Sequence, residues 1–96
     1  MTQQNNQIQI KADDHTLRGV YSNAANILHT KEEFVLDFMN IIPPTGTLNS
    51  RVIVSPGHFK QLVVAMQDNL KKYEAKFGNV QPAEVQTNPI GFQPKS

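Results

Sequence analysis

The sequence has 96 residues, with nine basic and eight acidic side chains and no cysteine. A chain of this length holds one domain with a small core, and the absence of cysteine excludes disulfides and thiolate metal sites as ways of stabilising it. The near-neutral charge argues against a dedicated nucleic-acid binder. No secretion signal and no membrane-spanning stretch is visible, so we expect a cytoplasmic protein with no membrane association.

Composition divides the chain into one domain and two tails. Residues 1–7 are polar and are predicted to be disordered, residues 8–78 form the folded domain, and residues 79–96, which contain prolines and glutamines, form a flexible tail. A docking peptide anchored by Ile90 and Phe92 is the alternative interpretation of this tail, and its composition favours simple flexibility.

The N-terminal part of the domain has weak strand signals. Ile8 and Ile10 alternate with polar residues, which predicts a short strand followed by a turn over residues 13–16. Residues 17–30 have alternating faces typical of a strand, but "SNAAN" in their middle has poor strand propensity and is compatible with a bulge or a helical turn.

The strongest predicted strand covers residues 32–42. It follows "TKEEF", which fits a helix capping box, but β-forming residues come next and a hairpin turn is therefore predicted. Phe34, Leu36 and Phe38 share one face of the strand. The other face carries Val35, Asp37, Met39 and Ile41.

A loop over residues 43–49 and a partner strand over residues 50–55 follow. A long amphipathic helix is then predicted from Pro56 to Phe77, with Ser55 as N-cap and Gly78 just beyond its end. Apolar residues recur at helical spacing and are expected to cover the Phe34 face of the sheet. They are Phe59, Leu62, Val63, Met66, Leu70, Tyr73 and Phe77.

These elements predict an α+β fold: an antiparallel sheet of three to four strands followed by one long C-terminal amphipathic helix. One helix covers one face of a sheet, so the second face needs another layer, and a second copy of the chain can provide it. We therefore expect a homodimer. The candidate interface residues are Val35, Asp37, Met39, Ile41, Arg51 and Ile53. Asp37 is expected either at a solvated margin or paired across that interface, for instance with Arg51.

Catalytic and metal chemistry find little support. His15, His29 and His58 have no metal-ligand spacing, and no cofactor motif occurs. A pairing of Asp37 with His29 or His58 is the one conceivable general-base arrangement, but no nucleophile motif accompanies it. We therefore expect a protein that is not an enzyme and that binds no cofactor.

Single-stranded nucleic acid is the alternative partner, bound through the sheet and basic side chains. Its candidate contacts are Arg18, Tyr21, Arg51, Lys60, Lys71 and Lys72. At this net charge, ordinary solvated faces account for them better.

Four segments carry a family resemblance: "YSN" at residues 21–23, "EFVLDF" at 33–38, "RVIVSP" at 51–56 and "NLKKYEAKFG" at 69–78. Together they resemble a small prokaryotic family known as domain of unknown function family 3467. The resemblance implies a compact, strand-rich domain with a C-terminal helix, and no activity or ligand. The strand-to-helix order is also similar to coactivator-type single-stranded DNA binders and to secretion chaperones, a likeness of fold alone. The expected function is a homodimeric module that binds or assembles with another macromolecule.

Overall fold

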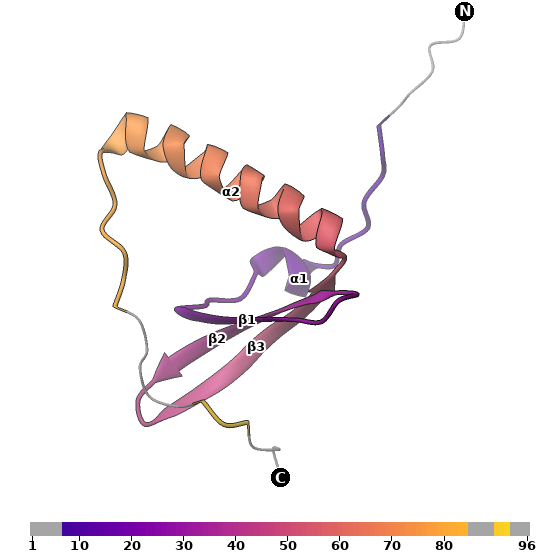
Figure 1. The fold of residues 1–96 in the computed structure, drawn as a ribbon, viewed down its shortest axis with the longest axis vertical. Coiled ribbons are helices and arrows are strands. Elements are labelled where there is room, and N and C mark those ends of the chain that lie inside the picture. The colour runs from indigo at the N-terminus through magenta and orange to yellow at the C-terminus, as the bar shows by residue number, and fades with distance from the viewer. Residues whose placement is uncertain (1–6, 85–89, 93–96) are drawn as a thin grey trace, which may run out of the picture.

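The computed structural model describes residues 7–84 and 90–92. Its elements are α1 (Asp14–Arg18), β1 (Ala24–His29), β2 (Phe34–Ile42), β3 (Thr45–Val54) and α2 (Pro56–Phe77). The three strands form one antiparallel sheet in the order β1-β2-β3, and α2 follows it (Figure 1). This confirms the predicted α+β fold with a long C-terminal helix.

The central strand β2 contains the buried part of the sheet. Among the described residues, those classed as buried are Leu36, Asp37 and Met39, which follow one another closely on this strand. β1 pairs with β2 in continuous register, whereas the β2–β3 ladder has a register shift between Phe38 and Met39, and Asp37 lies between Asn26 of β1 and Arg51 of β3. On a strand paired at both edges, each side chain has cross-strand neighbours on two sides, which favours apolar residues on both faces in the middle of β2.

Two tight turns join the strands. Between β1 and β2, the Thr30 backbone N–H donates to the Glu33 carbonyl at 2.9 Å, and the Thr30 hydroxyl accepts from two backbone N–H groups. This confirms the predicted hairpin turn. Between β2 and β3, the pair Pro43–Pro44 is joined by a cis peptide bond and β3 begins at Thr45, so the predicted loop over residues 43–49 is wrong. The proline pair itself makes the turn, and the residues after it are free to pair with β2.

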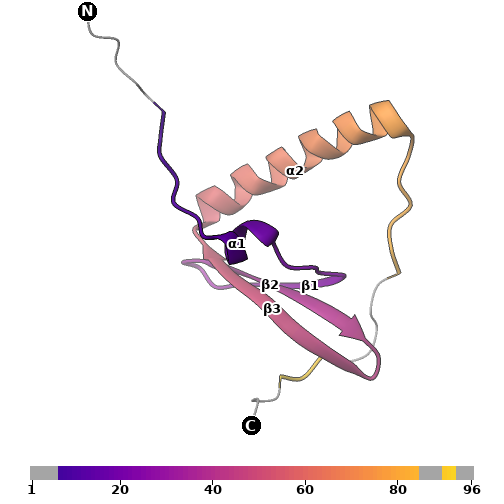
Figure 2. The same cartoon turned by 180° about the vertical axis from the view of Figure 1, so that it is seen from behind.

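The predicted N-terminal strand is also wrong. Ile8 and Ile10 belong to no strand and are 81% and 83% exposed, because this segment extends away from the sheet (Figure 2). The turn predicted after it is instead the short helix α1. The Asp13 carboxylate caps it by accepting from the Thr16 backbone N–H at 2.7 Å, and Gly19, at φ 76°, ends it.

The segment before β1 is tied to the sheet by side chains. The Asn23 side chain donates to the Ile41 carbonyl and accepts from the Ile41 backbone N–H, at 2.9 and 2.8 Å. The Ser22 hydroxyl donates to the carbonyls of Ala24 and Met39. The Asn23 side chain therefore continues the β1–β2 ladder past the end of β1, because it donates to and accepts from the Ile41 backbone as a backbone amide would.

The limits of α2 are those predicted. The Ser55 hydroxyl accepts from the His58 backbone N–H at 3.2 Å, Pro56 is the first helical residue, and Gly78 at φ 94° follows the last one. The Glu74 carbonyl accepts from the Gly78 backbone N–H.

The expected packing of α2 over the Phe34 face is wrong for most of the helix. The rings of Phe34 and Phe59 stack with their centroids 4.0 Å apart, but beyond its first turns α2 diverges from the sheet, and none of its residues is buried (Figures 1 and 2). Ser55 alone separates the end of β3 from the start of α2. With so short a connection, the direction of the helix is closely tied to the direction of the last residues of the strand.

Candidate functional site

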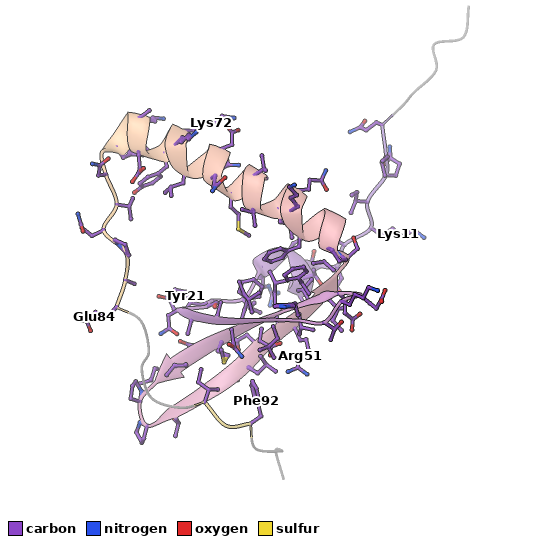
Figure 3. All side chains as sticks on the ribbon, in the orientation of Figure 1. Lys11, Tyr21, Arg51, Lys72, Glu84 and Phe92 are labelled. Carbon is purple, nitrogen blue, oxygen red and sulfur yellow. The ribbon has the colours of Figure 1, made fainter. Side chains whose placement is uncertain are left out.

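The sheet has two different surfaces, one on each side. The side toward α2 carries Phe34, whose ring stacks on Phe59. The side away from α2 carries Asp37 and Arg51, together with Phe92 from the C-terminal part of the chain (Figure 3). Each surface offers a separate candidate site.

Asp37 and Arg51 form a bidentate ion pair on the side away from α2. Arg51 donates from Nε to Oδ1 of Asp37 at 2.7 Å and from Nη2 to Oδ2 at 2.8 Å. The hydrogen bonds from Arg51 hold the pKa of the Asp37 carboxyl below its usual range, against the opposing effect of desolvation. The pairing predicted across a dimer interface therefore lies within one chain, between neighbouring strands.

The pair is asymmetric in its burial. The Asp37 side chain is fully buried, whereas 48% of the Arg51 side-chain surface is exposed. The buried carboxylate thus fixes the plane of the guanidinium. The exposed side of the guanidinium is available for contact with a group on the surface of the sheet.

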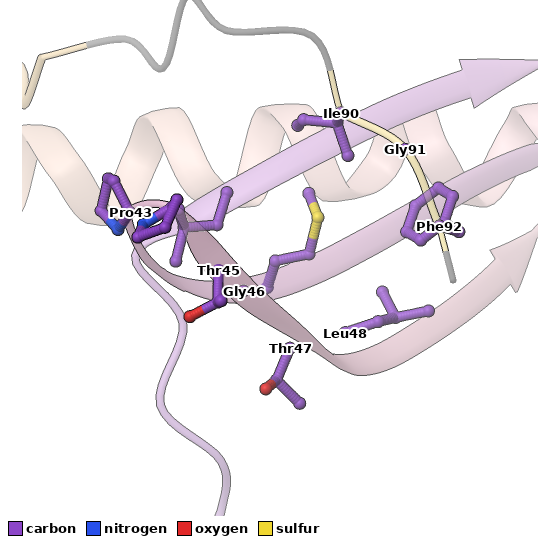
Figure 4. Close-up of a pocket in the computed structure, with 11 residues that line it drawn as sticks. Pro43, Thr45, Gly46, Thr47, Leu48, Ile90, Gly91 and Phe92 are labelled. Atoms are coloured by element: carbon purple, nitrogen blue, oxygen red, sulfur yellow. The ribbon is translucent and has the colours of Figure 1, made fainter. Parts of the chain in front are cut away.

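A pocket of about 220 Å³ lies beside this pair, at the β2–β3 hairpin (Figure 4). Its walls are Met39 and Ile41 of β2, the hairpin residues 43–48, and residues 90–92. The Arg51 guanidinium carbon lies 5.8 Å from the centroid of the Phe92 ring, within the range of a cation–π contact. Sequence reasoning named Ile90 and Phe92 as possible anchors, but it had no signal for where they lie.

The predicted interface residues have unequal surroundings. Asp37 and Met39 are buried in the single chain, and Ile41 and Val35 are partly so. Ile53 is 56% exposed on the same side of the sheet. Of these residues, Met39 and Ile41 of β2 line the pocket. Arg51 does not line it but contacts Phe92, which does.

The second surface is the apolar face of α2. Val63, Met66, Leu70, Tyr73 and Phe77 are between 37% and 65% exposed. The rings of Tyr73 and Phe77 lie 4.9 Å apart by their centroids, in a tilted arrangement. This row, which we call the α2 stripe, has the 3.6-residue periodicity of a buried helix face without a layer of the same chain against most of it.

The candidate nucleic-acid contacts do not gather into one groove. Arg51 lies on the side of the sheet away from α2, whereas Lys72 is on the helix (Figure 3). Arg51 is paired with Asp37 and Lys72 with Asp68, the latter at 3.2 Å. Lys60 and Lys71 are on α2, Arg18 ends α1, and Tyr21, 72% exposed, precedes β1.

His29 and His58 have neighbours other than Asp37. His58 Nδ1 lies 3.0 Å from the Gln61 side-chain oxygen, and the His29 ring lies against Phe34 with centroids 5.4 Å apart. Residues 7–84 and 90–92 contain no cluster of three or more potential metal-ligating side chains. Within the same residues, neither helix has the combination of length and apolar character needed to cross a bilayer.

Comparison with known proteins gives one match. The model of a family described as "Protein of unknown function (DUF3467)" matches residues 1–82. No curated protein and no solved structure matches the chain.

Proposed function

The chain belongs to the DUF3467 family, whose description assigns no activity, and we propose that it is a non-enzymatic module that assembles as a homodimer through the α2 stripe. The observation that carries the proposal is the divergence of α2 from its own sheet. This leaves a complete apolar helix face, from Val63 to Phe77, largely in contact with solvent.

The exposure of the α2 stripe supports a second layer. Its five side chains are between 37% and 65% exposed although they form one continuous apolar row along the helix. A contiguous apolar patch of this kind on the surface of a small protein is typical of an interface with another chain.

The chemistry of the stripe favours a second copy of the chain as the occupant. A two-fold interface brings a patch against itself, so a charged patch would meet like charges. The stripe from Val63 to Phe77 contains aliphatic and aromatic side chains and no ionised group, whereas Asp68 and Lys72 are paired on another face of the helix. Apolar surface of this kind gains about 25 cal/mol for each Å² removed from water.

The non-enzymatic part of the proposal is supported by the environment of Asp37. Both carboxylate oxygens accept hydrogen bonds from Arg51, and the lowered pKa keeps the group ionised. A carboxylate occupied in this way is a structural partner rather than an available general base.

Sedimentation equilibrium at micromolar concentration tests the dimer. We compare Leu70→Gln, which places an amide in the α2 stripe, with Val64→Gln as the matched control. Val64 is also apolar and 59% exposed, but it lies about 100° or more around the helix from the stripe residues. The wild type and Val64→Gln are expected to be dimers, and Leu70→Gln is expected to shift toward monomer by about tenfold or more in its dissociation constant.

Circular dichroism of all three proteins establishes that the substitutions leave the chain folded. A wild-type monomer at micromolar concentration would refute the proposal. Equal dissociation constants for the two variants would place the interface elsewhere than on the α2 stripe.

A further inference from the structure

The pocket at the β2–β3 hairpin is on the opposite side of the sheet from α2 and plays no part in the proposed dimer contact. Residues 90–92 reach it from the far end of the chain and pass across the strands (Figure 4). Ile90 and Phe92 are 43% and 52% exposed, so both side chains are partly covered there.

Phe92 contacts a preformed platform. The Arg51 guanidinium is held by two hydrogen bonds to buried Asp37, so its orientation is fixed before any ring approaches. A planar cation on a rigid sheet attracts the face of an aromatic ring, and fixing its side chain in advance lowers the entropic cost of the contact. The centroid of the Phe92 ring lies 5.8 Å from the guanidinium carbon of Arg51, a distance at which a cation–π contact is favourable.

Ile90 and Phe92 both face the pocket. They line it together with the apolar side chains of Met39, Ile41 and Leu48. The β2–β3 hairpin forms one side of the pocket, and an aliphatic group and an aromatic group two positions apart in the chain form the side that covers it.

The residue between the two anchors is not constrained by space. A Cβ built on Gly91 meets no atom within 4 Å. At Gly46, in the hairpin wall of the pocket, a Cβ would be crowded, since it would lie 3.1 Å from Cγ1 of Ile41. The hairpin wall therefore has no space for a larger residue at position 46, whereas position 91 accepts a side chain.

We propose that the β2–β3 hairpin and the Arg51 guanidinium form a binding surface for peptides that carry an aliphatic residue and an aromatic ring two positions apart, and that residues 90–92, which cover this surface and close the pocket, are a ligand supplied by the chain itself. An external segment of the same chemistry competes with residues 90–92 for this surface. Because the chain's own ligand is tethered, its effective concentration is high, and a competitor binds more weakly than it would to an uncovered surface.

The first experiment asks whether residues 90–92 lie against the β2–β3 hairpin and Arg51 in solution. In ¹H–¹⁵N NMR spectra of the full chain, Phe92→Ser is expected to shift the Arg51 Nε–H resonance and the backbone amides of Met39 and Leu48. Val80→Ser is the matched control, because Val80 is also an exposed apolar residue after α2 and does not line the pocket. Shifts from Phe92→Ser that remain confined to the neighbours of residue 92 would overturn the proposal.

The second experiment measures the binding site itself. A fluorescein-labelled peptide with the sequence of residues 87–94, TNPIGFQP, is titrated with the full-length wild type and with Phe92→Ser. Loss of the tethered competitor is expected to tighten peptide binding by on the order of two- to tenfold. Equal affinity for the two proteins, or no binding to Phe92→Ser at millimolar protein, contradicts the proposal.

Two controls define the ligand class. A peptide with Ser in place of the Phe should not bind, because it lacks the ring for Arg51. Gly91→Ala in the full chain should give the same peptide affinity as the wild type, since the central position has space for a Cβ. A Gly91→Ala protein that binds the peptide as tightly as Phe92→Ser would show that glycine itself is recognised, against the proposal.

Discussion

Asp37 and Arg51 face each other across β2 and β3 and are joined by two hydrogen bonds of 2.7 and 2.8 Å. The carboxylate is fully buried and the guanidinium is half in water. Asp37 therefore anchors the pair inside the sheet, and Arg51 presents its charge at the surface. The two residues are expected to respond differently to substitution.

Removing either partner should destabilise the fold in a non-additive way. Arg51→Ala leaves a buried carboxylate without its donors, and Asp37→Ala leaves the guanidinium without its anchor. In a double-mutant cycle measured by urea unfolding, the double variant should be less destabilised than the sum of the two single variants. Additive losses would mean that the pair contributes no coupling energy.

The pH dependence of stability should report the same pair. The folded pKa of Asp37 is below that of a free aspartate, so the unfolded chain binds a proton first as the pH falls. The contribution of the pair is complete above about pH 5, begins to decline near the ordinary Asp pKa of about 3.9, and is lost as the pH falls through the folded pKa.

This expectation is tested by measuring the melting temperature as a function of pH from about 2 to about 6, the range in which Asp side chains titrate. Asp37→Asn should flatten the acid limb of the curve. Asp13→Asn is the control: Asp13 also has a lowered pKa, through hydrogen bonds from Thr16, but it caps the exposed helix α1. Identical acid limbs for the wild type and Asp37→Asn would exclude Asp37 as the responsible group.

The core should be concentrated on β2. Leu36 is 5% exposed, so Leu36→Ala should lower the free energy of unfolding by about 2–5 kcal/mol. Ile42, at the end of the same strand, is 70% exposed, and Ile42→Ala should change it by less than about 0.5 kcal/mol. Chemical denaturation of both variants provides the comparison. Similar losses for the two would mean that burial on β2 is more uniform than the single chain shows.

Asn23 should matter more than its exposed position suggests. Asn23→Ala removes both side-chain hydrogen bonds to the backbone of Ile41 and should cost about 1–3 kcal/mol. Asn23→Asp keeps the acceptor for the Ile41 N–H and loses the donor, so an intermediate loss is expected. Hydrogen exchange of the Ile41 amide gives a local readout, and unchanged protection in Asn23→Ala would rule out this role.

Local signals in the sequence predicted the elements that depend on neighbouring residues. The two faces of β2 follow from alternation, and the start of α2 follows from Ser55 and Pro56. Two of the motif residues that carry the family resemblance also make local contacts, which are hydrogen bonds at the two ends of α2. Ser55 caps α2, and Glu74 accepts at the helix end, from Gly78 through its carbonyl and from Val80 through its side chain.

The relations between elements could not be predicted in this way. The partner of Asp37 depends on the register of β3, which is set by the turn at Pro43–Pro44 together with the register shift between Phe38 and Met39, and the sequence suggested a longer loop and no irregularity there. The divergence of α2 and the return of residues 90–92 are matters of direction, for which periodicity carries no information. The candidate pocket, which is formed by the β2–β3 hairpin and residues 90–92, was therefore missed.

The one-residue connection at Ser55 has a mechanical consequence. A helix of this length extends on the order of 33 Å, so a rotation of about 10° at Ser55 moves its far end by about 6 Å. Small changes in the twist of β3 are thereby amplified at Phe77, at the opposite end of α2. The stacked rings of Phe34 and Phe59 lie close to this connection, at the end of α2 where a rotation about Ser55 displaces the helix least.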